Sequence, residues 1–225
     1  MSTTGVGIDA YGSYFSGGIT NSGSISGYAG VYVDPSTFAG GITSSGTINS
    51  IYTGIYVYGS TFDGGITNSG TLTSSSGWGV FVQESAFSGG ITATKNSSIN
   101  ANKTGIDVRV STFSGGIVKA GAIVSSVAGG IEVFATNFSG GIVNKGPITA
   151  SNGYGILDDV SSFAGGVTNS GTISSFRPGI FIGSTSTLTP ALVTFDGGVL
   201  NSGTVASSQT GIFINRSPAG LRRAC

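Results

Sequence analysis

The sequence predicts an all-β protein, a single-stranded parallel β-helix that we expect to be right-handed. Three short strands should form each of about eight coils, with roughly 25 residues per coil. The first observation is that Phe-x-Gly-Gly occurs eight times, at steps of 23 to 32 residues. The second is that short apolar pieces between these motifs alternate with polar residues and are separated by Gly, Ser and Asn, as in strands and turns. The third is that strands this short cannot bury an apolar side alone, whereas stacked copies can. The motifs begin at Phe15, Phe38, Phe62, Phe87, Phe113, Phe138, Phe163 and Phe195.

The first strand of each unit follows the Gly-Gly pair, and its leading apolar residue recurs in every unit. We expect these residues to stack as one interior column: Ile19, Ile42, Ile66, Ile91, Ile117, Ile142, Val167 and Val199. The second strand supplies another: Ile25, Ile48, Leu72, Ile99, Ile123, Ile148, Ile173 and Val205. The third strand, of the form Ile/Val-x-Ile/Val, supplies the rest in most units, at residues 31–33, 55–57, 80–82, 106–108, 131–133, 180–182 and 212–214.

The corners between strands carry their own repeated residues. We expect the eight Phe side chains to stack inside one corner. The following Gly pairs should either take positive φ or allow close backbone approach at the bend. Asn recurs at one turn position, where it either forms a hydrogen-bonded ladder or suits the turn backbone. These residues are Asn21, Asn68, Asn144, Asn169 and Asn201.

Composition excludes several classes of function. The chain has 9 Lys+Arg and 9 Asp+Glu, so no excess charge favours nucleic acid. It has no His, and its single Cys is Cys225, so an internal disulfide or a Cys-based metal site is impossible. We expect no cofactor, no metal and, because no apolar run approaches about 20 residues, no membrane-spanning segment. We place the repeat domain at 1–215 and an irregular tail at 216–225.

The run Gly-Gly-Ile-Thr-Asn-Ser-Gly-Thr-Ile followed by Gly-Ile-x-Val resembles the repeats of bacterial autotransporter passenger domains. Residues 64–72 and 165–173 carry the resemblance best, and it extends over nearly the whole chain. It implies a parallel β-helix that is secreted or lies on the surface of a Gram-negative bacterium, often as a stalk. Passengers of this type include adhesins, proteases and lipases. We also expect this chain to be a piece of a longer protein.

One group of charged residues is a candidate for catalysis. Asp107 and Glu132 should share an outward column on adjacent coils, about 4.8 Å apart, with Arg109 on the same face. Polysaccharide-cleaving β-helices use carboxylates and basic residues on such a face, and a close carboxylate pair suits a retaining glycosidase. The alternative is a solvated polar patch. Asp158 falls at an interior position, and we expect a bulge that turns it outward while Val160 fills the gap. A calcium site at Asp158 with Asp159 is a weaker alternative.

An aromatic stripe on the third strand is the best candidate for a contact surface. It comprises Tyr32, Tyr56, Phe81, Phe181 and Phe213. Such rings form stabilising cross-strand ladders, and where exposed they offer a platform for sugars or another protein.

The insertion at residues 184–191 should reach the surface. A Thr row suited to ice binding begins at Thr20, Thr43, Thr67 and Thr92, but Val118 and Val143 interrupt it.

These observations favour a non-catalytic β-helical stalk or adhesive segment over an enzyme. A carbohydrate-active β-helix, either polysaccharide lyase or glycosidase, and an ice-binding protein are the alternatives. The expected partners are a host-surface glycan or protein, or further copies of the chain.

Overall fold

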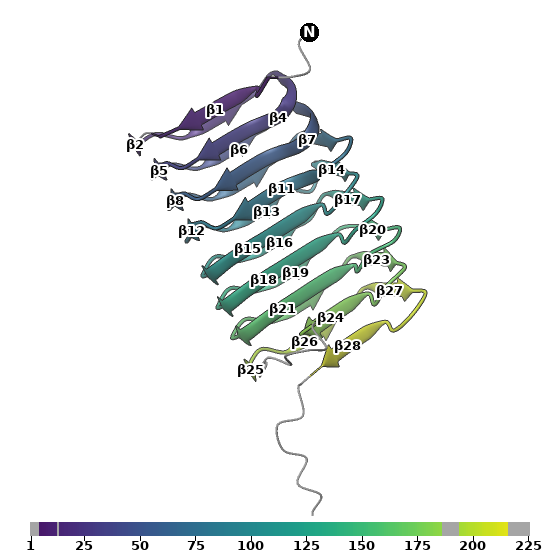
Figure 1. Cartoon of the computed structure of the whole chain (residues 1–225). Helices are drawn as coiled ribbons and strands as arrows, with labels where there is room; N and C mark the ends of the chain where they lie inside the picture. The colour runs from purple at the N-terminus through teal and green to yellow at the C-terminus, as the bar shows by residue number, and fades with distance from the viewer. Residues whose placement is uncertain (1–4, 13, 186–193, 216–225) are drawn as a thin grey trace, which may run out of the picture.

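A computed structural model describes residues 5–12, 14–185 and 194–215 and confirms the predicted fold class. The described residues are all β, and each strand pairs in parallel with its copies in the neighbouring coils. The coils stack into a rod of about seven turns (Figure 1). The predicted tail at 216–225 and residues 186–191 of the insertion lie outside the described residues.

One side of the rod is a sheet of eight strands, one from each unit, in the order β26-β22-β19-β16-β13-β9-β6-β3. All eight are the predicted first strand after Gly-Gly. Their bounds are β3 Ile19–Asn21, β6 Ile42–Ser44, β9 Ile66–Asn68, β13 Ile91–Ala93, β16 Ile117–Lys119, β19 Ile142–Asn144, β22 Val167–Asn169 and β26 Val199–Asn201.

The remaining twenty strands form a second, wrapped sheet. The second strand of the unit is β10 Thr71–Ser74, β14 Ser98–Ala101, β17 Ala122–Ser125, β20 Ile148–Ala150, β23 Thr172–Ser175 and β27 Thr204–Ser207. The third is β1 Ile8–Tyr11, β11 Trp78–Gln83, β24 Ile180–Gly183 and β28 Ile212–Asn215. Short strands lead into the Phe: β2 Tyr14–Phe15, β5 Thr37–Phe38, β8 Thr61–Phe62, β12 Ala86–Phe87 and β25 Thr194–Phe195. Five longer strands span two of these parts: β4 Ser24–Asp34, β7 Thr47–Tyr58, β15 Ile106–Phe113, β18 Ile131–Phe138 and β21 Ile156–Phe163.

The predicted interior columns are confirmed residue by residue. Both Ile/Leu/Val columns are paired in register along the whole described rod and are buried except in the end coils. The eight Phe rings form a continuous stack with centroids 4.9–5.6 Å apart. Such contacts add to the apolar area that each ring removes from water.

The glycines act through close backbone approach. Positive φ among described glycines occurs at Gly12, Gly59 and Gly183, outside the Phe-x-Gly-Gly pairs. A Cβ on Gly89 would instead run into the carbonyl group of Gly64 in the preceding coil. Of the two explanations offered by the sequence, close approach is therefore the one that holds at these pairs.

Polar ladders run inside two corners. The Asn144 side-chain amide donates to Asn169, which donates to Asn201, each at 2.7 Å. Asn68 instead donates to the Gly70 carbonyl in its own turn. Both explanations of the Asn column therefore apply, in different coils. In a second corner the backbone N–H of Ser36 donates to Ser60 Oγ at 3.1 Å.

The expected bulge at Asp158 is wrong. Asp158 pairs in register with Val133 and Ile182, and its side chain is completely buried. Val160 is buried as well, one interior position further on. Parallel partners on both sides hold β21 in register, so turning Asp158 outward would break pairs with both neighbouring coils. Burial therefore raises its pKa well above the ordinary value.

Candidate functional site

The outward side of the third strand is a single column that contains both candidate sites. In register along the rod it reads Asp9, Tyr32, Tyr56, Phe81, Asp107, Glu132, Leu157, Phe181 and Phe213. The predicted aromatic stripe and the predicted carboxylate pair are therefore neighbours. The neighbouring outward column contains Arg109, Phe134 and Asp159 on three successive coils.

Three aromatic members of this column stack face to face, whereas the Phe181 and Phe213 rings are tilted. The ring centroids of Tyr32 and Tyr56 are 5.0 Å apart, as are those of Tyr56 and Phe81. Trp78 stacks on Phe81 at 4.6 Å. Phe81 and Phe181 are buried, Tyr32 and Tyr56 are half-buried, and Phe213 is exposed. The stripe is thus a structural ladder over much of its length, with ring faces covered by other rings.

The carboxylate pair is adjacent as predicted, but it is not a solvated patch. Asp107 is completely buried and accepts two hydrogen bonds from Arg109, from Nε and Nη2, each at 2.9 Å. Glu132 accepts from the Thr104 hydroxyl at 2.9 Å and from the Gly129 backbone N–H at 3.1 Å. Burial raises the pKa of both carboxyls, and Arg109 and Trp78 oppose the rise at Asp107.

Both carboxyls are already engaged by groups of the protein. Both oxygens of each carboxyl are bonded within the protein, and side chains of neighbouring columns cover the pair. A glycosidase carboxyl must reach the glycosidic oxygen or the anomeric carbon of a bound sugar. The Arg109 side chain is still 46% exposed, and its guanidinium lies 4.9 Å from the Phe134 ring. The pair therefore fixes an arginine at the surface.

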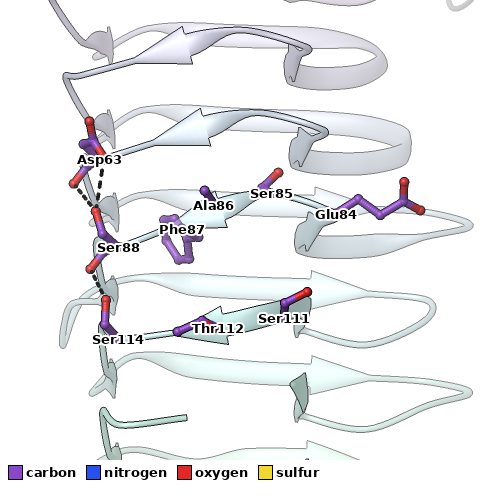
Figure 2. A pocket seen from close by; sticks show the side chains of 9 residues that line it. All are labelled: Asp63, Glu84, Ser85, Ala86, Phe87, Ser88, Ser111, Thr112 and Ser114. Carbon is purple, nitrogen blue, oxygen red and sulfur yellow. Dashed lines mark hydrogen bonds between the residues drawn. The ribbon is translucent and has the colours of Figure 1, made fainter. Parts of the chain in front are cut away.

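A surface groove lies beside this region, at the corner that leads into the Phe strands. It has a volume of about 620 Å³ and is lined by Asp63, Glu84, Ser85, Ala86, Phe87, Ser88, Ser111, Thr112 and Ser114. Figure 2 shows Asp63, Ser88 and Ser114 one above another at one end, and Glu84 at the other. A second depression of about 410 Å³, which includes Arg109 and Phe134, shares Glu84 and Ser111 with it.

The groove lies where the backbone structure of this corner changes from one coil to the next. Up to β12 the third strand ends in a turn with a buried serine, the last being Ser85. In the next three coils β15, β18 and β21 each run through the corner as one continuous strand, after which β24 and β25 are again separate. The outward column that crosses this junction also has its smallest side chain here, because Ala86 lies between Thr61 and Thr112. The other members are Tyr14, Thr37, Asn137, Ser162 and Thr194, so Ala86 is the smallest.

Glu84 closes one end of the groove in a strained backbone conformation. Its φ is +50°, the one positive value found for a non-glycine among the described residues. The equivalent turn one coil earlier uses Gly59, with φ +57°. Gln83 Nε2 donates to Glu84 Oε1 at 3.0 Å, and the Tyr58 hydroxyl bonds the same carboxylate, which raises the pKa of Tyr58. Strain of this kind tends to gather at functional positions.

Sequence analysis missed this groove. The available signal was the combination of Ala86 in a column of larger residues and Glu84 in a glycine position. It also missed Lys119, which is completely buried and donates to Asn144 Oδ1 at 3.1 Å and to the Pro147 carbonyl at 2.6 Å. Lys119 stands in the Asn column, and burial lowers its pKa to about 7.

Within the described ranges, no three His, Cys, Asp or Glu residues lie close enough to hold a metal ion, so the weaker proposal of calcium at Asp158 and Asp159 gains no support. No helix in that part of the chain is long and apolar enough to cross a membrane.

No protein-family model matches the sequence, and searches of curated proteins and of solved structures find no similar protein. The resemblance to autotransporter passengers rests on the repeats alone, and the structure supports the part of it that concerns the fold.

Proposed function

We propose that this chain is a non-catalytic β-helical segment, a stalk with an adhesive surface, in a cell-surface or secreted protein of the autotransporter type. The observation that carries the proposal is the unbroken in-register stacking of both interior columns along the described rod. Stability in such a rod comes from contacts between neighbouring coils, so the fold extends a surface without depending on a ligand.

The carboxylates add a second argument against the polysaccharide-cleaving alternative. Asp107 accepts hydrogen bonds from Arg109, and Glu132 accepts them from Thr104 and Gly129. A catalytic role would require breaking these bonds in a buried setting, where unpaired carboxylates are costly. The Thr row of the ice-binding alternative is broken by half-exposed or exposed Val118, Val143 and Leu200.

The proposal is tested with the purified chain in two assays. Beads coated with the chain should be retained on polysaccharide-coated or epithelial surfaces better than beads coated with albumin. Incubation with the same polysaccharides should release no new reducing ends and no unsaturated products. Turnover that disappears in Glu132→Gln would contradict the proposal and favour the carbohydrate-active alternative.

A further inference from the structure

We propose that the groove between Asp63 and Glu84 binds a neutral oligosaccharide. This inference rests on the adhesive role proposed above and gives it a place and a ligand class. The groove combines a hollow of about 620 Å³ with polar groups at both ends, in a part of the rod where the repeat pattern is broken.

The polar groups of the groove suit a polyhydroxylated ligand. The outer side chains offer hydroxyls at Ser88, Ser111, Thr112 and Ser114, which both donate and accept hydrogen bonds. The two carboxylates accept only, and each can receive two hydroxyl donors from one sugar ring. Glu84 is held by Gln83 and Tyr58, and Ser88 Oγ donates to Asp63 Oδ1 at 3.4 Å. Groups that are already oriented lose less entropy when a ligand binds.

The spacing of the carboxylates argues against a metal ion. Glu84 and Ser88 are joined by the turn at Glu84 and by β12, and they lie at opposite ends of the groove (Figure 2). Asp63 lies beside Ser88. A single cation needs its oxygen ligands within about 2.6 Å, so these two carboxylates cannot share one. The same separation fits a chain of sugar rings laid along the strand.

The charge of the groove selects among glycans. Its lining has two acidic residues and no Lys or Arg. Uronic acid polymers and sulfated glycans would meet like charge at both ends. A peptide strand cannot be added here by backbone pairing, because β12 already pairs with β8 on one side and with β15 on the other. A neutral oligosaccharide satisfies the hydroxyls and carboxylates without either conflict.

The repeats themselves supply variants that keep the fold. Ala86→Thr fills the floor with the residue found at the neighbouring positions 61 and 112. Asp63→Ser introduces the residue found at the equivalent positions 88 and 114. Ser162→Thr makes the same kind of change in the column of Ala86, but away from the groove, and is the matched control. Each variant should give an unchanged circular dichroism spectrum.

The experiment is calorimetric titration of the chain with neutral tetrasaccharides built from glucose, xylose, mannose or N-acetylglucosamine. Tetragalacturonate, a heparin tetrasaccharide and a lysine-rich peptide are the comparison ligands. We expect at least one neutral tetrasaccharide to bind, with affinity reduced about tenfold or more in Ala86→Thr and in Asp63→Ser, and unchanged in Ser162→Thr.

Three results would overturn the inference: no binding of any neutral tetrasaccharide at millimolar concentration, binding unaffected by Ala86→Thr and Asp63→Ser, or tighter binding of an anionic ligand or the peptide. Failure of the adhesive proposal is distinguishable. Bead retention that persists in Ala86→Thr would reject the groove as the adhesive site and leave the adhesive role of the chain standing. Polysaccharide turnover lost in Glu132→Gln would reject the non-catalytic role whatever the groove binds.

Discussion

In the described part of the chain, Lys119 and Asp158 are completely buried without an ion pair. Lys119 finds two neutral acceptors, whereas neither oxygen of Asp158 has a hydrogen-bond partner. A buried charge is costly, so both groups favour their neutral forms. Because one group is an acid and the other a base, they impose opposite pH dependences on folding.

Asp158 should make the protein less stable as pH rises. Its folded pKa is raised, so its unfavourable contribution is absent below the unfolded pKa of about 3.9 and grows as pH increases above it. We expect Asp158→Val, which restores the residue of its neighbour Val133, to stabilise the fold by about 1–3 kcal/mol at pH 7. Urea unfolding between pH 4 and pH 9 measures this. Asp9→Asn, at an exposed position, is the control, and a destabilised Asp158→Val would contradict the prediction.

Lys119 should act in the opposite direction. Its folded pKa is lowered to about 7, so the folded state gains stability as pH rises from 7 towards the unfolded pKa of about 10.4. We expect Lys119→Asn, which extends the Asn ladder, to be more stable than wild type at pH 7 and to lose that advantage near pH 10. Urea unfolding across this range tests it, with exposed Lys145→Asn as control. If the free energy of unfolding of the wild type is as flat between pH 7 and pH 10 as that of Lys119→Asn, the amine of Lys119 is not buried.

At the scale of the element, the glycine before each third strand sets how closely two strands pack. A Cβ on Gly105 would lie 2.7 Å from the Gly130 carbonyl oxygen and closer still to the Ile123 side chain. Because Gly105 has no side chain, the Ile123 side chain of the second-strand column can fill this corner.

We expect Gly105→Ala to destabilise the protein by about 1–3 kcal/mol through overpacking. Gly23→Ala is the matched control, because no atom lies within 4 Å of its added Cβ and its φ is not positive. That substitution should be neutral or slightly stabilising, since alanine restricts the unfolded chain. Thermal unfolding compares the two, and equal melting temperatures would show that the corner can yield.

The strands and their register follow from the sequence because a repeated unit repeats its side-chain pattern. Ile66 predicts the place of Ile91, and Leu72 that of Ile99. The pattern does not reveal which outward residues become covered. Asp107 is buried because of Trp78 and Arg109, which belong to other columns and differ from coil to coil. The groove is not evident from the pattern for the same reason, since it depends on the small side chain of Ala86.

At the scale of the whole molecule, the rod is a one-dimensional array. Each coil contacts the coil before it and the coil after it, so a local defect should weaken its neighbours and fade along the axis. The Phe stack connects all eight units through the interior. Phe113 stacks on Phe87 and Phe138, whereas Phe15, in the first unit, stacks on Phe38 and is half-buried.

We therefore expect Phe113→Ala to cost about 3–5 kcal/mol and Phe15→Ala markedly less, because the first leaves a cavity between two rings and the second opens to water. Hydrogen exchange should show protection lost on both sides of coil 113–137 in Phe113→Ala, and only near the first coil in Phe15→Ala. Urea unfolding gives the energies. If Phe113→Ala lowers protection uniformly from end to end, the rod unfolds as one cooperative unit and the nearest-neighbour description fails.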